Sequence, residues 1–310
     1  MKRLISLVSI TVLSLTLGVS SAFARGENYV ALGDSLAAGQ TPYQEIDAGY
    51  SDLVAMRLGM IGQLNHYTKQ LAFPGFTTAD VLERVQSEEA SALLANATLI
   101  TISAGANDLL RLVQVNPSAG TLTFSQLQVD FALNIARKNL TDLLAELKLR
   151  APNAKVYVMG YYFAYPNVHA TQKEGTNAQL LKLNTILEQQ AEQAGMTYVN
   201  VYDTFGLQAT HYLPNIADVH PNFEGYRQMA NAFLKSYSGS DGLAISTTEL
   251  PKPNPMTFQE IMEKQAESNE KSVAEQQEKV ATVRSIQGFI GYATFIEKVK
   301  ANQSIQPQRI

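Results

Sequence analysis

The sequence predicts an α/β fold, a three-layer α/β/α sandwich around a mainly five-stranded parallel sheet. The first observation is that short apolar segments alternate with longer segments of helical periodicity, which is the pattern of βαβ units. The second is the composition: 45% hydrophobic and 17% charged residues exclude a disordered, collagen-like or coiled-coil chain. The third is the length of 310 residues, which accommodates one large α/β domain and a further segment.

Five apolar segments of strand length are the predicted strands: Tyr29–Leu32, Gln63–Gln70, Thr98–Ser103, Lys155–Tyr162 and Thr197–Val201. Helical periodicity predicts helices over 48–60, 77–95, 124–150, 174–194 and 222–237. The third of these helices is bounded by Ser125 at its start and by Pro152 at its end. Because strands and helices alternate and no internal repeat is present, we expect a flavodoxin-like sheet with helices on both faces.

The N-terminus predicts export from the cell. Lys2 and Arg3 precede an apolar run of 16 residues, Leu4–Val19, which is followed by the small-residue pattern Ala22-Phe23-Ala24. These features are typical of a cleaved signal peptide over residues 1–24 and of a secreted, extracellular protein. The run is shorter than the roughly 20 residues that a membrane-spanning helix needs, so no stable membrane span is expected.

Cysteine content and charge exclude several kinds of chemistry. The chain has no cysteine, which removes disulfides, thiolate metal sites and cysteine nucleophiles, so covalent catalysis must use another residue. The net charge is −4 and gives no basic surface for nucleic acid, which is therefore not an expected partner. His169 and His211 lie in predicted loops without paired Asp or His spacing, so no metal site is expected.

A change in composition after Tyr237 predicts the end of the main domain, which we place at 25–238. Residues 239–255 are rich in Gly, Ser and Pro and read as a linker, because neither a helix nor a central strand tolerates them. The remaining segment, 256–310, is predicted to be a helical extension with one apolar stripe. Two interpretations stay open for it: packing on the main domain, or service as a substrate cap or partner-binding helix.

Ser35 lies where a nucleophile would be expected. It follows the first predicted strand in Gly33-Asp34-Ser35-Leu36 and precedes Ala37-Ala38-Gly39, where the chain must turn sharply. In open α/β sheets the ligand crevice lies outside the carboxyl ends of the strands. The motif alone is also typical of an ordinary turn, in which the Asp34 carboxylate accepts backbone hydrogen bonds.

Two later segments supply hydrogen-bond donors at the same edge of the sheet. Gly75 follows the second strand and offers a backbone N–H that no Cβ shields. Asn107 follows the third strand and offers a side-chain amide. Together with the Ser35 N–H, these donors have the composition of an oxyanion hole, which stabilises a tetrahedral acyl intermediate. Taken separately, Gly75 also fits a loop glycine and Asn107 a helix cap.

His220, just before the last helix of the domain, is the candidate general base. A serine hydroxyl needs a base of near-neutral pKa to become a nucleophile, and imidazole is the usual one. The aromatic residues of the fourth strand end and of a later loop fit either a substrate pocket or core packing: Tyr161, Tyr162, Phe163, Tyr165 and Tyr212.

Together these segments resemble a GDSL-type lipase/esterase of the SGNH hydrolase superfamily, of the secreted bacterial type. The resemblance covers 28–237 and consists of four ordered blocks: Gly33-Asp34-Ser35-Leu36, Gly75, Gly105-x-Asn107-Asp108 and His220-Pro221. It implies a three-layer sandwich and ester hydrolysis without metal or other cofactor. It also implies that Ser35 is nucleophile and oxyanion donor, that Gly75 and Asn107 complete the hole, and that His220 is the general base.

The residue that orients His220 departs from the family pattern. The family's acid usually stands three residues before the histidine, where this chain has Ala217. Asp218 stands two residues before, and in an extended segment it would point to the same side as His220. The alternatives are Asp203 at the end of the fifth strand, and a Ser–His pair supported by a backbone carbonyl.

The expected function is therefore hydrolysis of carboxylic esters by acyl transfer through Ser35, by a secreted lipase or esterase. The expected partner is a small-molecule or lipid ester such as a lysophospholipid. Two alternatives stay open: an O-acetylesterase acting on a carbohydrate or cell-wall polymer, and a non-catalytic binding or assembly protein that meets a partner through its C-terminal helices.

Overall fold

The structure is a computed structural model that describes residues 26–257, 259–261, 263 and 264. The predicted signal peptide, 1–24, lies outside the described residues, and so does most of the predicted helical extension, 256–310.

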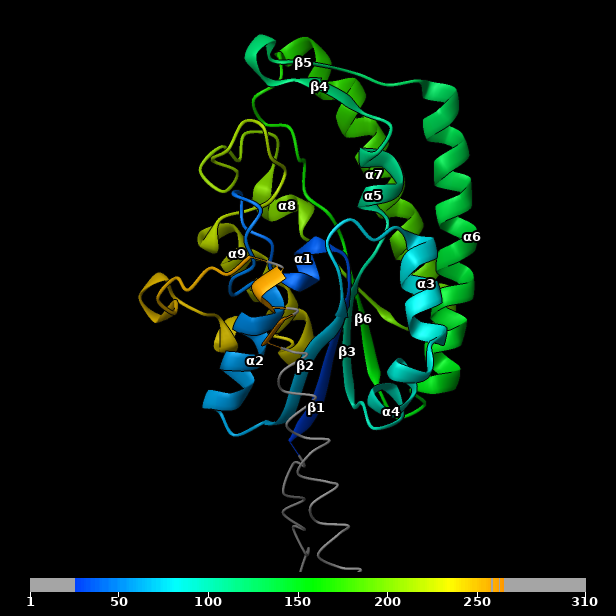
Figure 1. Ribbon diagram of the computed structural model, residues 1–310, viewed down its shortest axis with the longest axis vertical. Helices are drawn as coiled ribbons and strands as arrows, with labels where there is room; N and C mark the ends of the chain where they lie inside the picture. The colour runs from blue at the N-terminus through cyan, green and yellow to red at the C-terminus, as the bar shows by residue number, and fades with distance from the viewer. Residues whose placement is uncertain (1–25, 258, 262, 265–310) are drawn as a thin grey trace, which may run out of the picture.

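A parallel sheet of five strands forms the centre of the described domain (Figure 1). Its spatial order is β2-β1-β3-β6-β7, with every neighbouring pair parallel. The strands are β1 (Glu27–Gly33), β2 (Leu64–Ala72), β3 (Leu99–Ser103), β6 (Lys155–Met159) and β7 (Thr197–Val199). This is the flavodoxin-like order, so the predicted fold class is confirmed.

The central strands are buried because helices cover both faces of the sheet. Every residue of β3 is buried, and β1 is buried from Tyr29 to its end. Strands covered on both faces are continuous apolar runs rather than alternating ones, which is why these segments could be recognised in the sequence.

The helices form the two outer layers (Figure 1). α2 (Tyr50–Met60) and α9 (Phe223–Ser238) pack together on one face. On the other face, α6 (Gln126–Arg150) packs between α3 (Thr78–Gln86) and α7 (Ala170–Ala194). Across the residues that the structure describes, none of the helices combines the length and apolar character needed to cross a membrane.

The single helix predicted over 77–95 is wrong, because the chain forms two helices there. α3 ends at Gln86, and Ser87 is extended with φ −66° and ψ 155°. The Ser87 side chain then accepts a hydrogen bond from Ala90 N and caps the next helix, α4 (Glu88–Ala95). A serine inside a helical pattern is thus a start signal here.

Several short elements at the carboxyl edge of the sheet were not predicted. They are α1 (Ser35–Ala38), α5 (Ala106–Leu110), α8 (Tyr202–Phe205), and a hairpin of β4 (Gln114–Asn116) and β5 (Thr121–Thr123) around the 3-10 turn η1 (Pro117–Ala119). The predicted fourth and fifth strands also end earlier, at Met159 and Val199. Such short elements carry too little periodicity to be read from sequence.

The segment predicted as a linker, 239–255, packs on the domain. It contains two 3-10 turns, η2 (Asp241–Leu243) and η3 (Thr247–Glu249), with Ile245 buried between them. Arg57 on α2 forms an ion pair with Glu249 at 2.8 Å. Beyond the proline-rich stretch, Met256 pairs with Ile46 through two backbone hydrogen bonds of 2.7 and 2.9 Å.

Candidate active site

Ser35 lies on a tight turn at the carboxyl end of β1, and glycines make this turn possible. Gly33 has φ +133°, and a Cβ there would lie 2.0 Å from the Ser103 carbonyl oxygen. After β1 the chain enters the one-turn helix α1, which ends at Gly39 in the left-handed conformation. Ser35 is the first residue of α1, so no intrahelical acceptor is available to its N–H.

Asp34 anchors this turn from a fully buried position. Its carboxylate accepts hydrogen bonds from Leu36 N at 3.0 Å, Ser103 Oγ at 2.7 Å and the Tyr161 hydroxyl at 2.6 Å. Burial raises the pKa of Asp34, although the three hydrogen bonds and His220 oppose that rise. The predicted backbone bond is therefore present, and two side-chain donors from neighbouring strand ends join it.

Ser35, His220 and Asp218 form a continuous hydrogen-bonded line. His220 Nε2 lies 2.7 Å from Ser35 Oγ, and His220 Nδ1 lies 2.7 Å from Asp218 Oδ1. The same carboxylate oxygen also accepts the backbone N–H of His220 at 2.7 Å. The three residues that the sequence singled out thus meet, although 185 positions separate Ser35 from His220.

The rival acid does not take part in this line. Asp203 lies at the start of α8, where it forms hydrogen bonds of 3.0 and 3.3 Å with Asn200. Ala217, at the family's usual acid position, is exposed. In a Ser–His pair supported by a backbone carbonyl, His220 Nδ1 would contact that carbonyl. In the structure, His220 Nδ1 contacts Asp218 instead.

The loop that carries His220 is held by contacts from distant parts of the chain. The Tyr162 hydroxyl donates to Val219 O at 2.7 Å, and Asn215 Nδ2 donates to Pro42 O at 2.7 Å. Just after the histidine, Asn222 caps α9 by accepting from Gly225 N at 3.0 Å.

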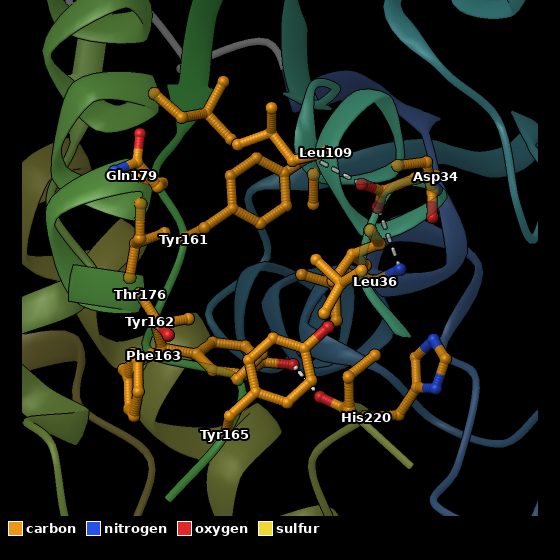
Figure 2. Close-up of a pocket in the computed structure, with 18 of the residues that line it drawn as sticks. Asp34, Leu36, Leu109, Tyr161, Tyr162, Phe163, Tyr165, Thr176, Gln179 and His220 are labelled. Atoms are coloured by element: carbon orange, nitrogen blue, oxygen red, sulfur yellow. Dashed lines mark hydrogen bonds between the residues drawn. The ribbon is translucent and has the colours of Figure 1, made fainter. Parts of the chain in front are cut away.

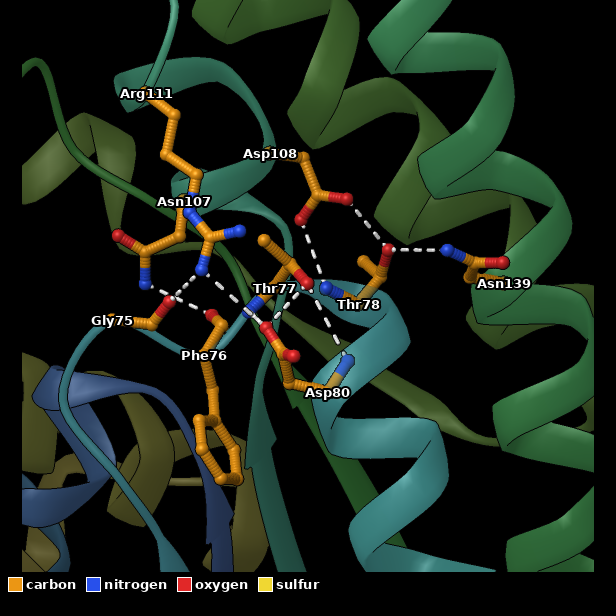
Figure 3. Close-up of polar contacts among 9 residues, drawn as sticks. All are labelled: Gly75, Phe76, Thr77, Thr78, Asp80, Asn107, Asp108, Arg111 and Asn139. Carbon is orange, nitrogen blue, oxygen red and sulfur yellow. Dashed lines mark hydrogen bonds and ion pairs between the residues drawn. The ribbon is translucent and has the colours of Figure 1, made fainter.

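Gly75 and Asn107 lie on two segments that contact each other (Figure 3). Gly75 has φ +82°, a conformation that favours glycine. Asn107 lies inside α5, whose cap is Gly105, so the interpretation of Asn107 as a helix cap is wrong. Its Nδ2 donates to Phe76 O at 2.9 Å, which joins α5 to the residue after Gly75. Asn107 also lines the same pocket as Ser35 and His220.

This pocket extends from Ser35 and His220 between α5 and α7 and has a volume of about 90 Å³ (Figure 2). Its lining is largely apolar and includes Leu36, Leu109, Leu110, Val113, Phe124, Val129, Leu180 and Leu183. Four of the five predicted aromatic candidates, Tyr161, Tyr162, Phe163 and Tyr165, also line it. The fifth, Tyr212, packs against Phe205 instead, with ring centroids 4.9 Å apart.

Burial also fixes the protonation state of one pocket residue. It raises the pKa of Tyr161 well above the usual value for tyrosine, so the Tyr161 hydroxyl stays protonated and donates to Asp34. Among the described residues, no group of three or more His, Asp or Glu side chains is placed to hold a metal ion.

A flavodoxin-like sandwich with a hydrogen-bonded serine, histidine and aspartate at the carboxyl edge of its sheet belongs to the class of SGNH hydrolases. Residues 31–228 match the GDSL-like lipase/acylhydrolase family. The chain is therefore a member of that family and a carboxylic ester hydrolase.

Solved structures share the fold at low sequence identity. A lipase from a goat rumen metagenome is 20% identical with a TM-score of 0.53, over 69% of this chain and 98% of that one. A variant of an acetyl xylan esterase from Geobacillus stearothermophilus is 19% identical with a TM-score of 0.52, over 72% and 98%. An extracellular lipase from Streptomyces rimosus is 20% identical with a TM-score of 0.50, over 68% and 98%. No curated protein matches the sequence.

Proposed function

We propose that this protein is an exported serine esterase that cleaves carboxylic esters with a lipid-like acyl chain, including lysophospholipids and short acylglycerols. The observation that carries the proposal is that Ser35 Oγ, hydrogen-bonded to His220, lines a largely apolar pocket.

The hydrogen-bond line supports a defined sequence of proton transfers. With Nδ1–H donating to Asp218, Nε2 of His220 is free to accept the Ser35 proton as the Oγ attacks the ester carbonyl. Collapse of the tetrahedral intermediate breaks the ester bond, and His220 gives its proton to the leaving alcohol. Water then attacks the acyl-enzyme by the same route, releasing the acid and restoring Ser35.

We assign three donors to the negative charge on the tetrahedral intermediate; Ser35 and Asn107 line the pocket, and Gly75 lies on the segment that Asn107 contacts. The donors are the backbone N–H groups of Ser35 and Gly75 and the Asn107 side-chain amide. An amide nitrogen carries two hydrogens, so the bond from Asn107 to Phe76 O leaves one for the substrate. One such donor is typically worth about 3 to 4 kcal/mol of transition-state stabilisation.

The pocket lining favours an acyl chain over an acetyl group. Each methylene group buried in such a site contributes about 0.8 kcal/mol, whereas an acetyl group would leave most of the leucine and aromatic lining unfilled. This argues for lipid-like esters over the O-acetylesterase alternative. A non-catalytic binding protein would have no need for the Ser35–His220–Asp218 line.

Export is supported by the sequence alone, through Lys2, Arg3, the apolar run and Ala22-Phe23-Ala24. Protein recovered from the culture medium should have an N-terminal sequence that begins near Arg25, which N-terminal sequencing would measure. Retention in the cell with an intact N-terminus would contradict this part of the proposal.

The proposal is tested by hydrolysis of p-nitrophenyl acetate, butyrate, octanoate and palmitate by the wild type, Ser35→Ala and Ser91→Ala. Ser91 is an exposed serine on α4 and serves as the matched control. We expect Ser35→Ala to lose activity, Ser91→Ala to keep it, and octanoate or longer esters to be preferred over acetate. Equal activity in wild type and Ser35→Ala would overturn the serine mechanism, and strict preference for acetate would overturn the acyl-chain assignment.

A further inference from the structure

Arg111, the residue after α5, reaches the loop that carries Gly75 (Figure 3). Its guanidinium Nη2 donates to the Gly75 carbonyl oxygen at 2.7 Å. A hydrogen bond from a charged donor at this distance is about twice as strong as one between neutral groups. Arg111 does not line the pocket beside Ser35, so any effect on the reaction must pass through the loop.

Gly75 lies in a turn that is closed by a hydrogen bond of 3.3 Å from Phe76 N to Phe73 O. Its φ of +82° is open to glycine in several nearby conformations, and a Cβ at this position would meet nothing within 4 Å. Within the described part of the chain, Arg111 provides the one side-chain hydrogen bond to Gly75. One residue further on, Asn107 donates to Phe76 O at 2.9 Å.

The C-terminal side of the same loop is anchored without Arg111. Thr78 is fully buried, donates to the Asp108 carboxylate through its N–H at 2.9 Å and its hydroxyl at 2.7 Å, and accepts from Asn139 Nδ2 at 3.0 Å. Thr77 and Asp80 form a capping box at the start of α3. Loss of Arg111 would therefore release the Gly75 carbonyl group while leaving α3 in place.

Arg111 also lies 3.4 Å from Asp80, which stabilises its position over the loop. Partial burial of Asp80 opposes ionisation, but hydrogen bonds from Thr77 and the charge of Arg111 lower the Asp80 pKa. The carboxylate therefore remains charged at neutral pH and holds the guanidinium. Because 59% of the Arg111 side chain is exposed, this ion pair contributes little to folding stability.

From this geometry we infer that Arg111 is a positioning residue that aims the Gly75 N–H at the developing oxyanion. The Arg111 hydrogen bond fixes the Gly75–Phe76 peptide, and through the Gly75 Cα it restrains the adjoining Pro74–Gly75 peptide that carries the N–H. The inference rests on the proposed function, in which Gly75 is an oxyanion donor. Arg111 belongs to none of the four sequence blocks that carry the resemblance to the family.

The test compares the wild type, Ser35→Ala, Arg111→Ala, Arg111→Lys and Arg137→Ala on p-nitrophenyl octanoate. Arg137 is a half-buried arginine of α6 that hydrogen-bonds the Gln189 side chain, and it serves as the control. Small misplacements of a donor typically cost one to two orders of magnitude in rate, so we expect kcat of Arg111→Ala to fall about tenfold. KM and the melting temperature should stay near those of the wild type, and Arg111→Lys should retain part of the rate.

Two further measurements separate positioning from general structural damage. Affinity for octylboronic acid, which forms a tetrahedral adduct with the serine, should weaken by the same factor as kcat/KM. Added guanidinium at non-denaturing concentration should restore activity in Arg111→Ala but not change the wild type or Arg137→Ala.

The outcomes distinguish this inference from the proposed function. An inactive wild type, or one no more active than Ser35→Ala, would overturn the proposed function. A wild type with Ser35-dependent activity and an equally active Arg111→Ala would overturn the inference alone. Loss of activity in Arg111→Ala with a raised KM, a lowered melting temperature and no response to guanidinium would also overturn it.

Discussion

The nucleophile turn, 33–39, and the histidine loop, 213–222, meet at one hydrogen bond but are built differently. Every residue of the turn is buried, and it continues a central strand of the sheet. The histidine loop has buried residues only near its ends, at Leu213 and Pro221, and Ile216 between them is 55% exposed. Its position is set by single hydrogen bonds from Tyr162 and Asn215 and by the cap of α9.

The two halves of the site are therefore stabilised by different means. Changes in the turn should affect both folding and activity, because its residues are part of the core. Changes in the histidine loop should affect activity with little effect on global stability, because few buried contacts depend on it.

Within the histidine loop, Asp218→Ala should cause a large loss of activity. Removal of the group that orients the imidazole in serine hydrolases lowers kcat by about ten-thousandfold, so we expect a loss of that order. The unfolding free energy, measured by urea denaturation, should change little. Asp203→Ala is the matched control and should keep full activity; comparable losses in both variants would show that Asp218 has no special role.

Asp34→Asn tests the buried turn through the pH dependence of its stability. The raised pKa of Asp34 means that the folded state binds the proton more tightly than the unfolded state. The stability that this tighter proton binding provides is therefore fully present below the pKa of Asp34 in the unfolded state, near 3.8. It is lost as the pH rises through the higher pKa of Asp34 in the folded state. The stability of the Asn variant relative to wild type should increase over that range and then level off.

Urea denaturation of both proteins at a series of pH values measures this difference, because titrating groups that do not interact with Asp34 cancel between them. A difference that is independent of pH, or that falls as pH rises, would show that burial does not dominate the environment of Asp34.

The smallest expected effect is that of Tyr162→Phe. The substitution removes the hydroxyl that donates to Val219 O and leaves the stacking of the ring on Phe205 in place. Loss of one such hydrogen bond costs about 1 kcal/mol, and the histidine next to Val219 should be less well held, so kcat should fall a few-fold. Tyr43→Phe, at a 69% exposed tyrosine, is the control; a kcat for Tyr162→Phe equal to that of wild type would show that the loop needs no such support.

The fold was largely predictable, because the central strands are continuous apolar runs and the long helices have clear ends. The predicted site residues Ser35, His220 and Asp218 come together, since local rules place a serine after a strand and residues i and i+2 on one side of an extended segment. The contacts of Tyr161 with Asp34 and of Arg111 with Gly75 could not be predicted. These contacts join segments that are far apart in the chain, and neither hydrophobic periodicity nor a local motif indicates them.

The pairing of Met256 with Ile46 determines where the chain can be shortened without disturbing the site. Ile46 belongs to the loop in which Gln40 O accepts from the Tyr226 hydroxyl and Pro42 O accepts from Asn215 Nδ2. A truncation at Pro251 would remove the strand partner of this loop and, through Asn215, loosen the segment before Asp218 and His220. A deletion meant to reveal the role of the C-terminal residues should therefore retain Met256.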